Sequence, residues 1–357
     1  MLEAIAAARS EVLLEMYWVG ADPAGSRFRD ALVACARRGV VVRVLYDDVG
    51  SLGLSGSWWA PLEAVGGTVA SYSPIAPWRK RFRWVQIFFR DHRKLLVVDG
   101  EVGVAGGINL ARPWLPGEEG GLDWRDDAIE VRGPIALDLR RVFASTWERC
   151  GKPGLEGSSA PPRIGTLTGP QVEGASRASV LANRIGPRPD RRIRRAYLQA
   201  IRRARVSVDI ASSYFLPGPI FLHALRAACR RGVRVRILIP KVGDIWLASL
   251  AVSHLVGRLL EDGVEVYAYA RRMLHSKTAI VDRRLVIIGS HNLDTLSWRY
   301  NLECNVAVDD EAFAENVVQT FGRDIEDAER LDLGAWRRRP LRLRLLAWAV
   351  ARFRMLL

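Results

Sequence analysis

The chain has 357 residues, 49% of them hydrophobic, which suits two domains or one large two-lobed unit with an ample core. Its formal net charge of +14 indicates attraction to polyanions, either nucleic acid or anionic lipid. No apolar run reaches the roughly 20 residues of a spanning helix, and the first residues lack the pattern of a secretory signal. We therefore expect a protein that stays in the cytosol without a membrane-spanning segment.

The first half begins with a pattern of alternating helices and strands. "AIAAARSEVLLEMYW" from Ala4 fits a helix and a strand, and "ALVACARRGVVVRVLYDDVG" from Ala31 fits a helix, an Arg-Gly-Val turn and a second strand. "PWRKRFRWVQIFFRDH" from Pro77 then interleaves basic and aromatic residues. That stretch suits a membrane interface or a single-stranded nucleic acid, and a β-hairpin with a solvated basic edge is the structural alternative.

A polar motif follows on a segment that is otherwise apolar, "DHRKLLVVDGEVGVAGGINL" from Asp91. Alternate residues of a strand share a face, so its His and Lys point the same way. The Asn returns on the next strand after a small Gly, which permits close backbone approach. The positions that define this motif are His92, Lys94, Asp99, Gly106 and Asn109.

The second half repeats the first. "ALRAACRRGVRVRILIPKVG" from Ala224 aligns without gaps on the stretch from Ala31, and "AIRRARVSVDIASSYF" from Ala200 is similar to the stretch from Ala4. "LHSKTAIVDRRLVIIGSHNL" from Leu274 repeats the polar motif at constant spacing. Its equivalent positions are His275, Lys277, Asp282, Gly289 and Asn292.

The repeat predicts an α/β fold with two pseudo-symmetric lobes, each with its sheet buried between helices. "GKPGLEGSSAPPRIGTLTGPQ" from Gly151 is rich in Gly, Pro and Ser and reads as the connection. We expect a first lobe at 1–150, a linker at 151–178, a second lobe at 179–330 and a basic amphipathic tail at 331–357. A twofold-like contact between the lobes brings both motifs to one active site at their interface.

Two imidazoles, two ammonium groups and two carboxamides at one site suit attack on a phosphodiester. One imidazole attacks phosphorus while the other protonates the departing alcohol. Lys94, Lys277 and the two Asn side chains neutralise charge on the non-bridging oxygens, as metal ions do in other phosphodiesterases. We expect no metal and no cofactor. The four cysteines, Cys35, Cys150, Cys229 and Cys304, are scattered and read as reduced packing residues rather than disulfides or a zinc site.

Two HxKxxxxD motifs, each followed by G(G/S)xN, make the chain resemble the phospholipase D superfamily over nearly its whole length. It is similar in particular to short bacterial cardiolipin synthases, through "WRDDAIEVRGP", "SSYFLPG" and "HSKTAIVD…IIGSHNLDTLSWRYNLECNV". The resemblance implies phospholipase D-like lobes, each a mixed β-sheet flanked by helices. It further implies a phosphohistidine on His92, and His275 as general acid and base. It also implies that Asp126 and Glu303 hold the imidazoles in their tautomers, whereas Asp99 and Asp282 brace loops.

From these patterns we predict three sets of site residues. The catalytic set is His92, Lys94, Asp99, His275, Lys277 and Asp282. The phosphate-binding set is Asn109, Asn292 and Ser290, although Ser290 and Ser276 suit a structural role equally well. The histidine-orienting set is Asp126 and Glu303. We give His223 and His254 structural or surface roles and leave His291 out, because its position in the motif varies within the family.

The tail "WRRRPLRLRLLAWAVARFRMLL" from Trp336 predicts a helix after Pro340 with Leu341, Leu345 and Trp348 along one side and arginines around them. Such a helix is typical of binding to anionic lipid, and docking against the first lobe is the alternative. "IWLASLAVSHLVGRLL" from Ile245 either lines an acyl-chain groove or packs as a core helix.

The predicted function is a cardiolipin synthase-type phosphatidyltransferase that joins two phosphatidylglycerol molecules and releases glycerol. The alternative is a phosphodiesterase that uses water, either a phospholipase D or a nuclease; a basic binding protein without activity fits the two intact motifs less well. We expect anionic phospholipids and the membrane surface as partners, no nucleic acid, and a peripheral location on the cytoplasmic face.

Overall fold

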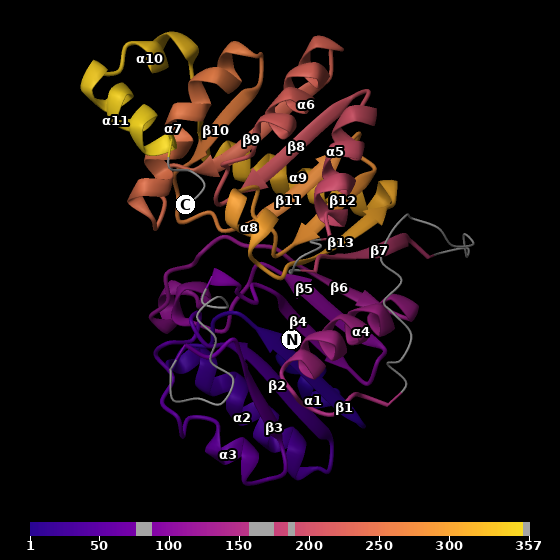
Figure 1. Ribbon diagram of the computed structural model, residues 1–357. Coiled ribbons are helices and arrows are strands. Elements are labelled where there is room, and N and C mark those ends of the chain that lie inside the picture. The colour runs from indigo at the N-terminus through magenta and orange to yellow at the C-terminus, as the bar shows by residue number, and fades with distance from the viewer. Residues whose placement is uncertain (76–87, 157–174, 185–189, 353–357) are drawn as a thin grey trace.

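The computed structural model describes residues 1–75, 88–156, 175–184 and 190–352. Most of the stretch from Pro77, up to residue 87, and most of the predicted linker therefore lie outside the described residues. The chain forms two lobes, the first at the bottom and the second at the top of Figure 1, each built on its own β-sheet.

The first sheet has six strands in the order β3-β2-β1-β4-β5-β6. β1, β2 and β3 are parallel, and β4, β5 and β6 continue the sheet with antiparallel neighbours. The strands are β1 (Glu11–Met16), β2 (Val41–Asp47), β3 (Thr68–Tyr72), β4 (Lys94–Val98), β5 (Val102–Gly106) and β6 (Ala128–Arg132).

The second sheet has eight strands in the order β14-β10-β9-β8-β11-β12-β13-β7. They are β7 (Arg177–Ala182), β8 (Ser207–Ser212), β9 (Arg234–Pro240), β10 (Glu265–Tyr269), β11 (Lys277–Val281), β12 (Leu285–Gly289), β13 (Cys304–Asp309) and β14 (Ala328–Arg330). The inner six, β10-β9-β8-β11-β12-β13, repeat the order and direction of the whole first sheet, and β7 and β14 are added at the two edges. This duplicated mixed α/β architecture confirms the predicted fold class.

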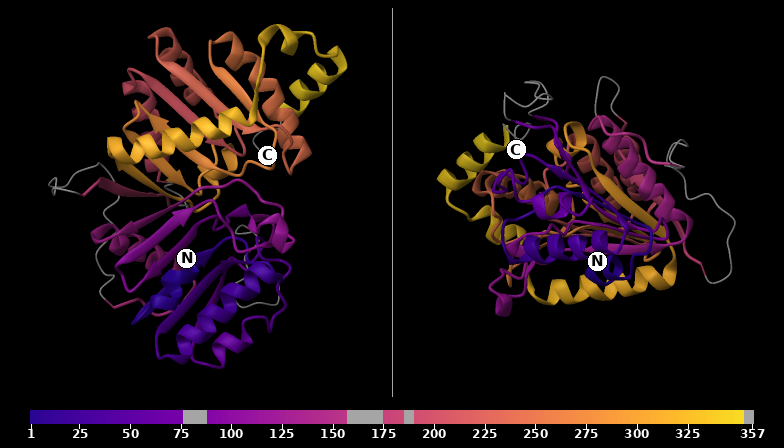
Figure 2. Two further views of the ribbon diagram at one scale, coloured as in Figure 1. Left: turned by 180° about the vertical axis from the view of Figure 1, so that it is seen from behind. Right: turned by 90° about the horizontal axis from the view of Figure 1, so that it is seen from below.

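Helices cover both faces of each sheet, as the two views of Figure 2 show. In the first lobe, α1 (Leu2–Ala7), α2 (Pro23–Arg37) and α3 (Ala60–Glu63) pack on one face and α4 (Pro134–Arg149) on the other. In the second lobe, α5 (Arg192–Arg203), α6 (Pro219–Arg230) and α7 (Trp246–Glu261) cover one face and α9 (Glu311–Glu326) the other. Shorter helical turns in the loops are η2 (Arg112–Trp114), η3 (Gly117–Glu119) and α8 (Thr295–Arg299).

Burial on both faces explains why the central strands are apolar throughout. In β4, Leu95 and Val97 pack towards α4, whereas Leu96 and Val98 pack towards α1 and α2. The core against α4 continues without a break into the core between the second sheet and α9. Because one apolar cluster runs through both lobes, the contact between them is part of the folded core, which fixes the two polar motifs relative to each other.

The tail forms α10 (Leu333–Arg337) and α11 (Leu341–Arg352), both of which lie against α7. Val350 and Ala351 of α11 pack on Ala251 and Leu255 of α7. The helix predicted after Pro340 is therefore present, but the alternative of docking against the first lobe is wrong: α7, in the second lobe, offers the apolar surface. The outer side of α11 leaves Leu341, Leu345 and Trp348 exposed.

Candidate active site

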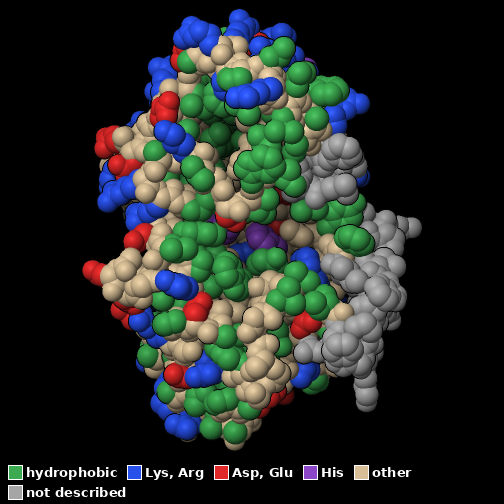
Figure 3. All heavy atoms as spheres, turned by 90° about the vertical axis from the view of Figure 1, so that its left-hand side faces the viewer, with side chains coloured by type: hydrophobic (Ala, Val, Ile, Leu, Met, Phe, Trp, Pro, Cys, Tyr) green, Lys and Arg blue, Asp and Glu red, His purple; other side chains and the backbone are tan. Residues whose placement is uncertain are grey.

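Both polar motifs reach the interface between the lobes at the start of a central strand. β4 begins at Lys94 and β11 at Lys277, and each histidine lies two residues earlier. The His92 amide donates to the Leu302 carbonyl (2.9 Å), and the His275 amide donates to the Arg125 carbonyl (2.7 Å). Each motif is thus held by a backbone hydrogen bond to the opposite lobe, and Figure 3 shows histidine side chains in the hollow at the waist of the molecule.

Each imidazole is bound by a carboxylate from the other lobe. The Nδ1 atom of His92 lies 3.1 Å from both carboxylate oxygens of Glu303, and the Nδ1 atom of His275 lies 2.5 Å from Oδ2 of Asp126. A carboxylate at Nδ1 favours the tautomer with its proton there, so Nε2 is left for chemistry. The sequence indicated these two acids; the structure shows that each partners the histidine of the opposite motif.

The two lysines are buried beside the histidines. Lys94 Nζ donates to the His92 carbonyl (2.7 Å) and lies 5.0 Å from the centre of the Tyr17 ring. Lys277 Nζ donates to the His275 carbonyl and lies 2.9 Å from Nδ1 of the same histidine. Burial lowers the pKa of Lys94 to about 7, and the Lys277 charge acts in the same direction. Two buried ammonium groups whose charges act on each other favour an anionic ligand between them.

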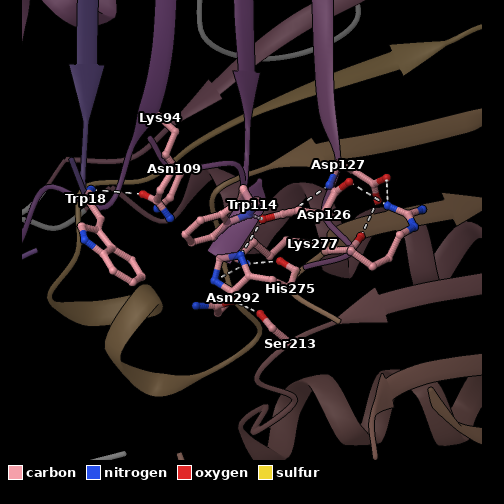
Figure 4. Close-up of polar contacts among 12 residues, drawn as sticks. Trp18, Lys94, Asn109, Trp114, Asp126, Asp127, Ser213, His275, Lys277 and Asn292 are labelled. Carbon is pink, nitrogen blue, oxygen red and sulfur yellow. Dashed lines mark hydrogen bonds and ion pairs between the residues drawn. The ribbon is translucent and has the colours of Figure 1, made fainter. Parts of the chain in front are cut away.

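The imidazoles are poor bases in this environment. Burial, followed by the charges of Lys94 and Lys277, lowers the pKa of His92 well below its ordinary value. Burial and Lys277 lower the pKa of His275 to about 4. Since each histidine is affected by the lysine of the other lobe, the four groups share one site, and Figure 4 shows side chains of both lobes converging there. A bound phosphodiester anion offsets the lysine charges and makes proton uptake by an imidazole easier.

The two asparagines occupy equivalent places at the rim of this site (Figure 4). Asn109 accepts a hydrogen bond at Oδ1 from the Trp18 amide (3.1 Å), and Asn292 accepts one at Oδ1 from the Ser213 hydroxyl (2.9 Å). Fixing the amide oxygen in this way leaves the Nδ2 group of each Asn to donate, as phosphate binding requires.

Asp99 and Asp282 are not brought into the site. Asp99 follows the five residues of β4, which places it about 16 Å along the strand from Lys94. Its carboxylate accepts from the backbone amides of Arg9, Ser10 and Glu11, and Asp282 accepts from those of residues 205–207. We therefore correct their place in the catalytic set: both brace the start of a neighbouring central strand, because they meet backbone amides and no imidazole.

Ser290 and Ser276 also have structural partners. Ser290 donates to Glu303 Oε2 and accepts from the Cys304 amide (3.0 Å), so its proton is directed to the carboxylate that holds His92. Ser276 donates to Asp127. Of the two roles that its place in the sequence allows, Ser290 therefore fits the structural one, the positioning of Glu303.

Sequence reasoning missed the aromatic residues that enclose the histidines. The Tyr17 ring lies edge-on to His92 with 4.8 Å between ring centres. Trp114 donates from Nε1 to Asp126 (2.9 Å), and its ring lies edge-on to that of His275. The ring centres of Trp124 and His275 are 5.5 Å apart. Tyr17 belongs to the repeated stretch from Ala4, so the repeat carried a signal for it, whereas the two tryptophans come from the loop between β5 and β6, outside the positions that define the repeated motif.

Support for Glu303 was also missed. The Asn183 side chain accepts from the Glu303 amide (2.7 Å), and buried Arg93 donates to the Glu303 carbonyl (3.3 Å). These contacts fix the backbone that presents the carboxylate to His92. Among the described residues there is no group of three or more His, Cys, Asp or Glu arranged to hold a metal ion, and none of the helices described is long and apolar enough to cross a membrane.

Comparison with known proteins shows the family to which the chain belongs. The family model described as "Cardiolipin synthase, PLD-like domain" matches residues 1–146 and 197–325. A cardiolipin synthase of Alkalihalophilus pseudofirmus is 33% identical over 97% of this chain and 67% of its own length, and one of Geobacillus kaustophilus is 34% identical over 95% and 66%. This chain thus spans about two thirds of the length of those relatives.

Among solved structures, a phosphatidylserine synthase of Haemophilus influenzae matches with a TM-score of 0.68 and 15% identity, over 100% of this chain and 92% of its own. That likeness shows the fold. Two sheets of matching strand order, with paired His-Lys motifs between them, define the phospholipase D-like class of proteins. Within that class, the chain belongs to the cardiolipin synthase family.

Proposed function

We propose that the protein is a phosphatidyltransferase that makes cardiolipin and glycerol from two molecules of phosphatidylglycerol. The observation that carries this proposal is the pair of imidazoles at the lobe interface, each held at Nδ1 by a carboxylate and flanked by a buried lysine. Family membership supports lipid substrates, because the relatives are named as cardiolipin synthases.

In the first step, Nε2 of His92 attacks the phosphorus of one phosphatidylglycerol. The bond from phosphorus to the headgroup glycerol oxygen breaks, and His275 gives that oxygen a proton. In the second step, a hydroxyl of another phosphatidylglycerol attacks the phosphohistidine, the P–N bond breaks, and His275 takes the hydroxyl proton. Lys94, Lys277, Asn109 and Asn292 stabilise the negative oxygens in both transition states.

The two carboxylates support different roles for the two histidines. Burial opposes ionisation of Asp126, but the charges of His275 and Lys277 lower its pKa below the ordinary value, so it is ionised. An ionised partner stabilises a protonated His275, which suits proton transfer. Burial raises the pKa of Glu303, so the ionised form of this carboxyl group is disfavoured. A partner of this kind favours a neutral, nucleophilic His92.

Binding at a membrane surface is the further part of this proposal, and α11 supports it. Leu341, Leu343, Leu345 and Trp348 are exposed there beside Arg342 and Arg344, as in helices that lie in the lipid interface. On another side of α7, a cavity of about 300 Å³ is lined by Ala248, Val252 and Val256 together with Trp336. Its apolar lining suits an acyl chain, which favours the groove interpretation of the stretch from Ile245.

Lipid mass spectrometry after incubation with phosphatidylglycerol vesicles tests the proposal. We expect cardiolipin and glycerol to form together. Phosphatidic acid as the main product indicates water as acceptor and replaces this proposal with a phospholipase D, and cleavage of single-stranded DNA in a parallel reaction indicates a nuclease.

A further inference from the structure

A large cavity lies in the second lobe next to the candidate active site. It has a volume of about 700 Å³ and is lined by residues of α5, α6, α7, α8, α11 and the segment that follows Gly289. We call it the acceptor cavity. Asn183, which orients Glu303, lies in its wall, so the cavity adjoins the support of His92.

The first pointer to a ligand is His291. It stands between Ser290 and Asn292 in the second motif, is 1% exposed, and lines the acceptor cavity. Its ring packs against Trp298 with 4.0 Å between ring centres, and neither ring nitrogen has a hydrogen-bond partner within the described ranges. A buried imidazole with two unpaired nitrogens is costly, so a ligand that supplies a donor or an acceptor lowers the free energy of the site.

The second pointer is the positive charge of the lining. Arg191, Arg194, Arg258, Arg299 and Arg352 line the cavity, and the ion pairs of the described residues include none of them. Asp190, the carboxylate in the lining, pairs with Arg192 instead. Burial and repulsion from Arg191 and Arg299 lower the pKa of Arg194, which shows that these cations crowd one another. An anion in the cavity relieves that repulsion.

The start of α5 contains arginine where a helix is stabilised by acids. Its first turn has no acidic residue, and Arg191 at its N-cap makes no side-chain cap hydrogen bond. Cations at this end oppose the helix dipole, and the Asp190 carboxylate just before the helix offsets them only in part by accepting from the Arg192 amide (2.9 Å). The first turn of α6, at Gly218 and Pro219, lines the cavity too. The arrangement is unfavourable for the free helix and favourable for a bound phosphate.

The remaining lining indicates an amphiphile rather than a free phosphate. Phe221, Leu255, Trp298 and Trp348 give the cavity an apolar side. Trp348 belongs to α11, whose outer face exposes a row of leucines. An anionic headgroup with acyl chains satisfies both the arginines and this side, and α11 places the cavity beside the surface proposed to meet lipid.

We propose that the acceptor cavity binds the phosphodiester headgroup of the second, acceptor phospholipid, with Arg194, Arg258 and Arg299 around the phosphate and His291 bonded to the headgroup. The acceptor role rests on the proposed transferase activity, whereas binding of an anionic phospholipid in the cavity does not depend on turnover. It explains why the second lobe carries arginines and a tail helix around its histidine motif.

Binding is measured first, in a His92→Asn background that cannot turn lipid over. Isothermal titration calorimetry uses dihexanoyl phosphatidylglycerol below its micelle concentration. We expect two lipids per chain, and one per chain after Arg194→Gln, Arg258→Gln and Arg299→Gln are combined. The matched control combines Arg195→Gln, Arg202→Gln and Arg203→Gln, exposed arginines of α5 outside the lining, and keeps two.

Competitors in the same titration distinguish a lipid headgroup from free phosphate as the group that the cavity binds. We expect neither inorganic phosphate nor glycerol 1-phosphate at millimolar concentration to displace the second lipid, and dihexanoyl phosphatidylcholine to occupy one site. Displacement by inorganic phosphate identifies a site for free phosphate and overturns the lipid assignment. A single lipid in the parent, or two in the triple variant, overturns the cavity.

Turnover by the otherwise native chain tests the acceptor role. With the triple variant, we expect formation of the phosphatidyl-enzyme within twofold of the native rate, cardiolipin release at least tenfold slower, and a larger share of phosphatidic acid. Equal loss of both half-reactions, or loss in the control variant, contradicts the acceptor role. If the native chain makes no cardiolipin but the titration shows the arginine-dependent second lipid, the proposed function fails and the binding site remains.

Discussion

The two polar motifs have nearly the same sequence but different surroundings. His92 faces Glu303, whose pKa is raised by burial, while His275 faces Asp126, whose pKa is lowered by the charges of His275 and Lys277. His92 lies against Tyr17, and His275 lies between Trp114 and Trp124. A duplicated scaffold has thus kept the geometry equal and let the electrostatics diverge, which is what a nucleophile and a proton carrier need.

Loss of either histidine is the strongest test of this division of roles. His92→Ala and His275→Ala are each expected to lower cardiolipin synthesis by at least about 10³-fold, because one removes the nucleophile and the other the acid and base. Phosphorylated His92 is expected to accumulate in His275→Ala and is measured by intact-protein mass spectrometry under alkaline conditions. Accumulation on His275 in the His92 variant instead reverses the assignment.

The carboxylates sharpen the comparison. Asp126→Asn removes an ionised partner from the proton carrier, so we expect kcat to fall by about 10²-fold. Glu303→Gln removes a carboxylate that burial has already weakened, and its effect on kcat is expected to be several times smaller. Steady-state kinetics on mixed micelles measures both. Equal losses in the two variants contradict the electrostatic difference between the motifs.

The pH profile tests the charge of Lys94. Its pKa is lowered to about 7, so the lysine carries its proton below that pH and loses it as the pH rises. Since the protonated form holds the phosphate, kcat/KM is expected to fall several-fold between about pH 7 and pH 9. Arginine keeps its charge in this range, so in Lys94→Arg the alkaline fall is expected to move up or vanish, whatever the absolute rate.

A smaller effect, on vesicle binding, is expected from changes in the tail helix α11, which packs on the second lobe. Changing Leu341, Leu343 and Leu345 to Ser removes exposed apolar groups that lie outside the lining of the acceptor cavity and outside the contact between α11 and α7, so the fold is retained. We expect several-fold weaker sedimentation with anionic vesicles and unchanged activity on dihexanoyl phosphatidylglycerol dispersed in solution. The control is Leu52→Ser, an exposed leucine of the first lobe. Unchanged vesicle binding removes α11 from the membrane contact.

The smallest catalytic effect is expected at the two motif aspartates. Asp99→Ala and Asp282→Ala leave backbone amides unpaired far from the histidines, which costs about 1–3 kcal/mol of unfolding free energy. Chemical denaturation measures that loss, and kcat per folded molecule is expected to stay within twofold. A large fall in kcat with unchanged stability returns these residues to the catalytic set.

The repeat in the sequence predicted the architecture because each half had to bury the same apolar face. The pairing of the lobes followed from the repeat, whereas the two acids that bind the histidines came from the resemblance to the phospholipase D superfamily. The repeat could not predict that Glu303 binds His92 and that Asp126 binds His275 across the lobe interface, because spacing along a chain does not say which lobe a loop faces. Asp99 and Asp282 look catalytic within the motif, yet the length of a strand separates them from the site.

The residues that sequence reasoning set aside depend on tertiary contacts. His291 varies in the family, and its importance appears only when its unpaired nitrogens are seen to line a cavity beside five arginines. Those arginines come from α5, α7, α8 and α11, so no local motif marks them. Trp114 and Trp124 lie in the loop between β5 and β6, outside the positions that define the repeated motif, so the motif gave no reason to select them.

The exchange of carboxylates between lobes has a consequence for synthesis of the protein. While the ribosome has delivered only the first lobe, His92 has no Glu303 beside it and Asp126 has no histidine to hold. A fragment that contains only one of the halves is in the same position. The proposed activity on lipid therefore requires both halves to be made and docked, because neither half alone holds a histidine together with its carboxylate.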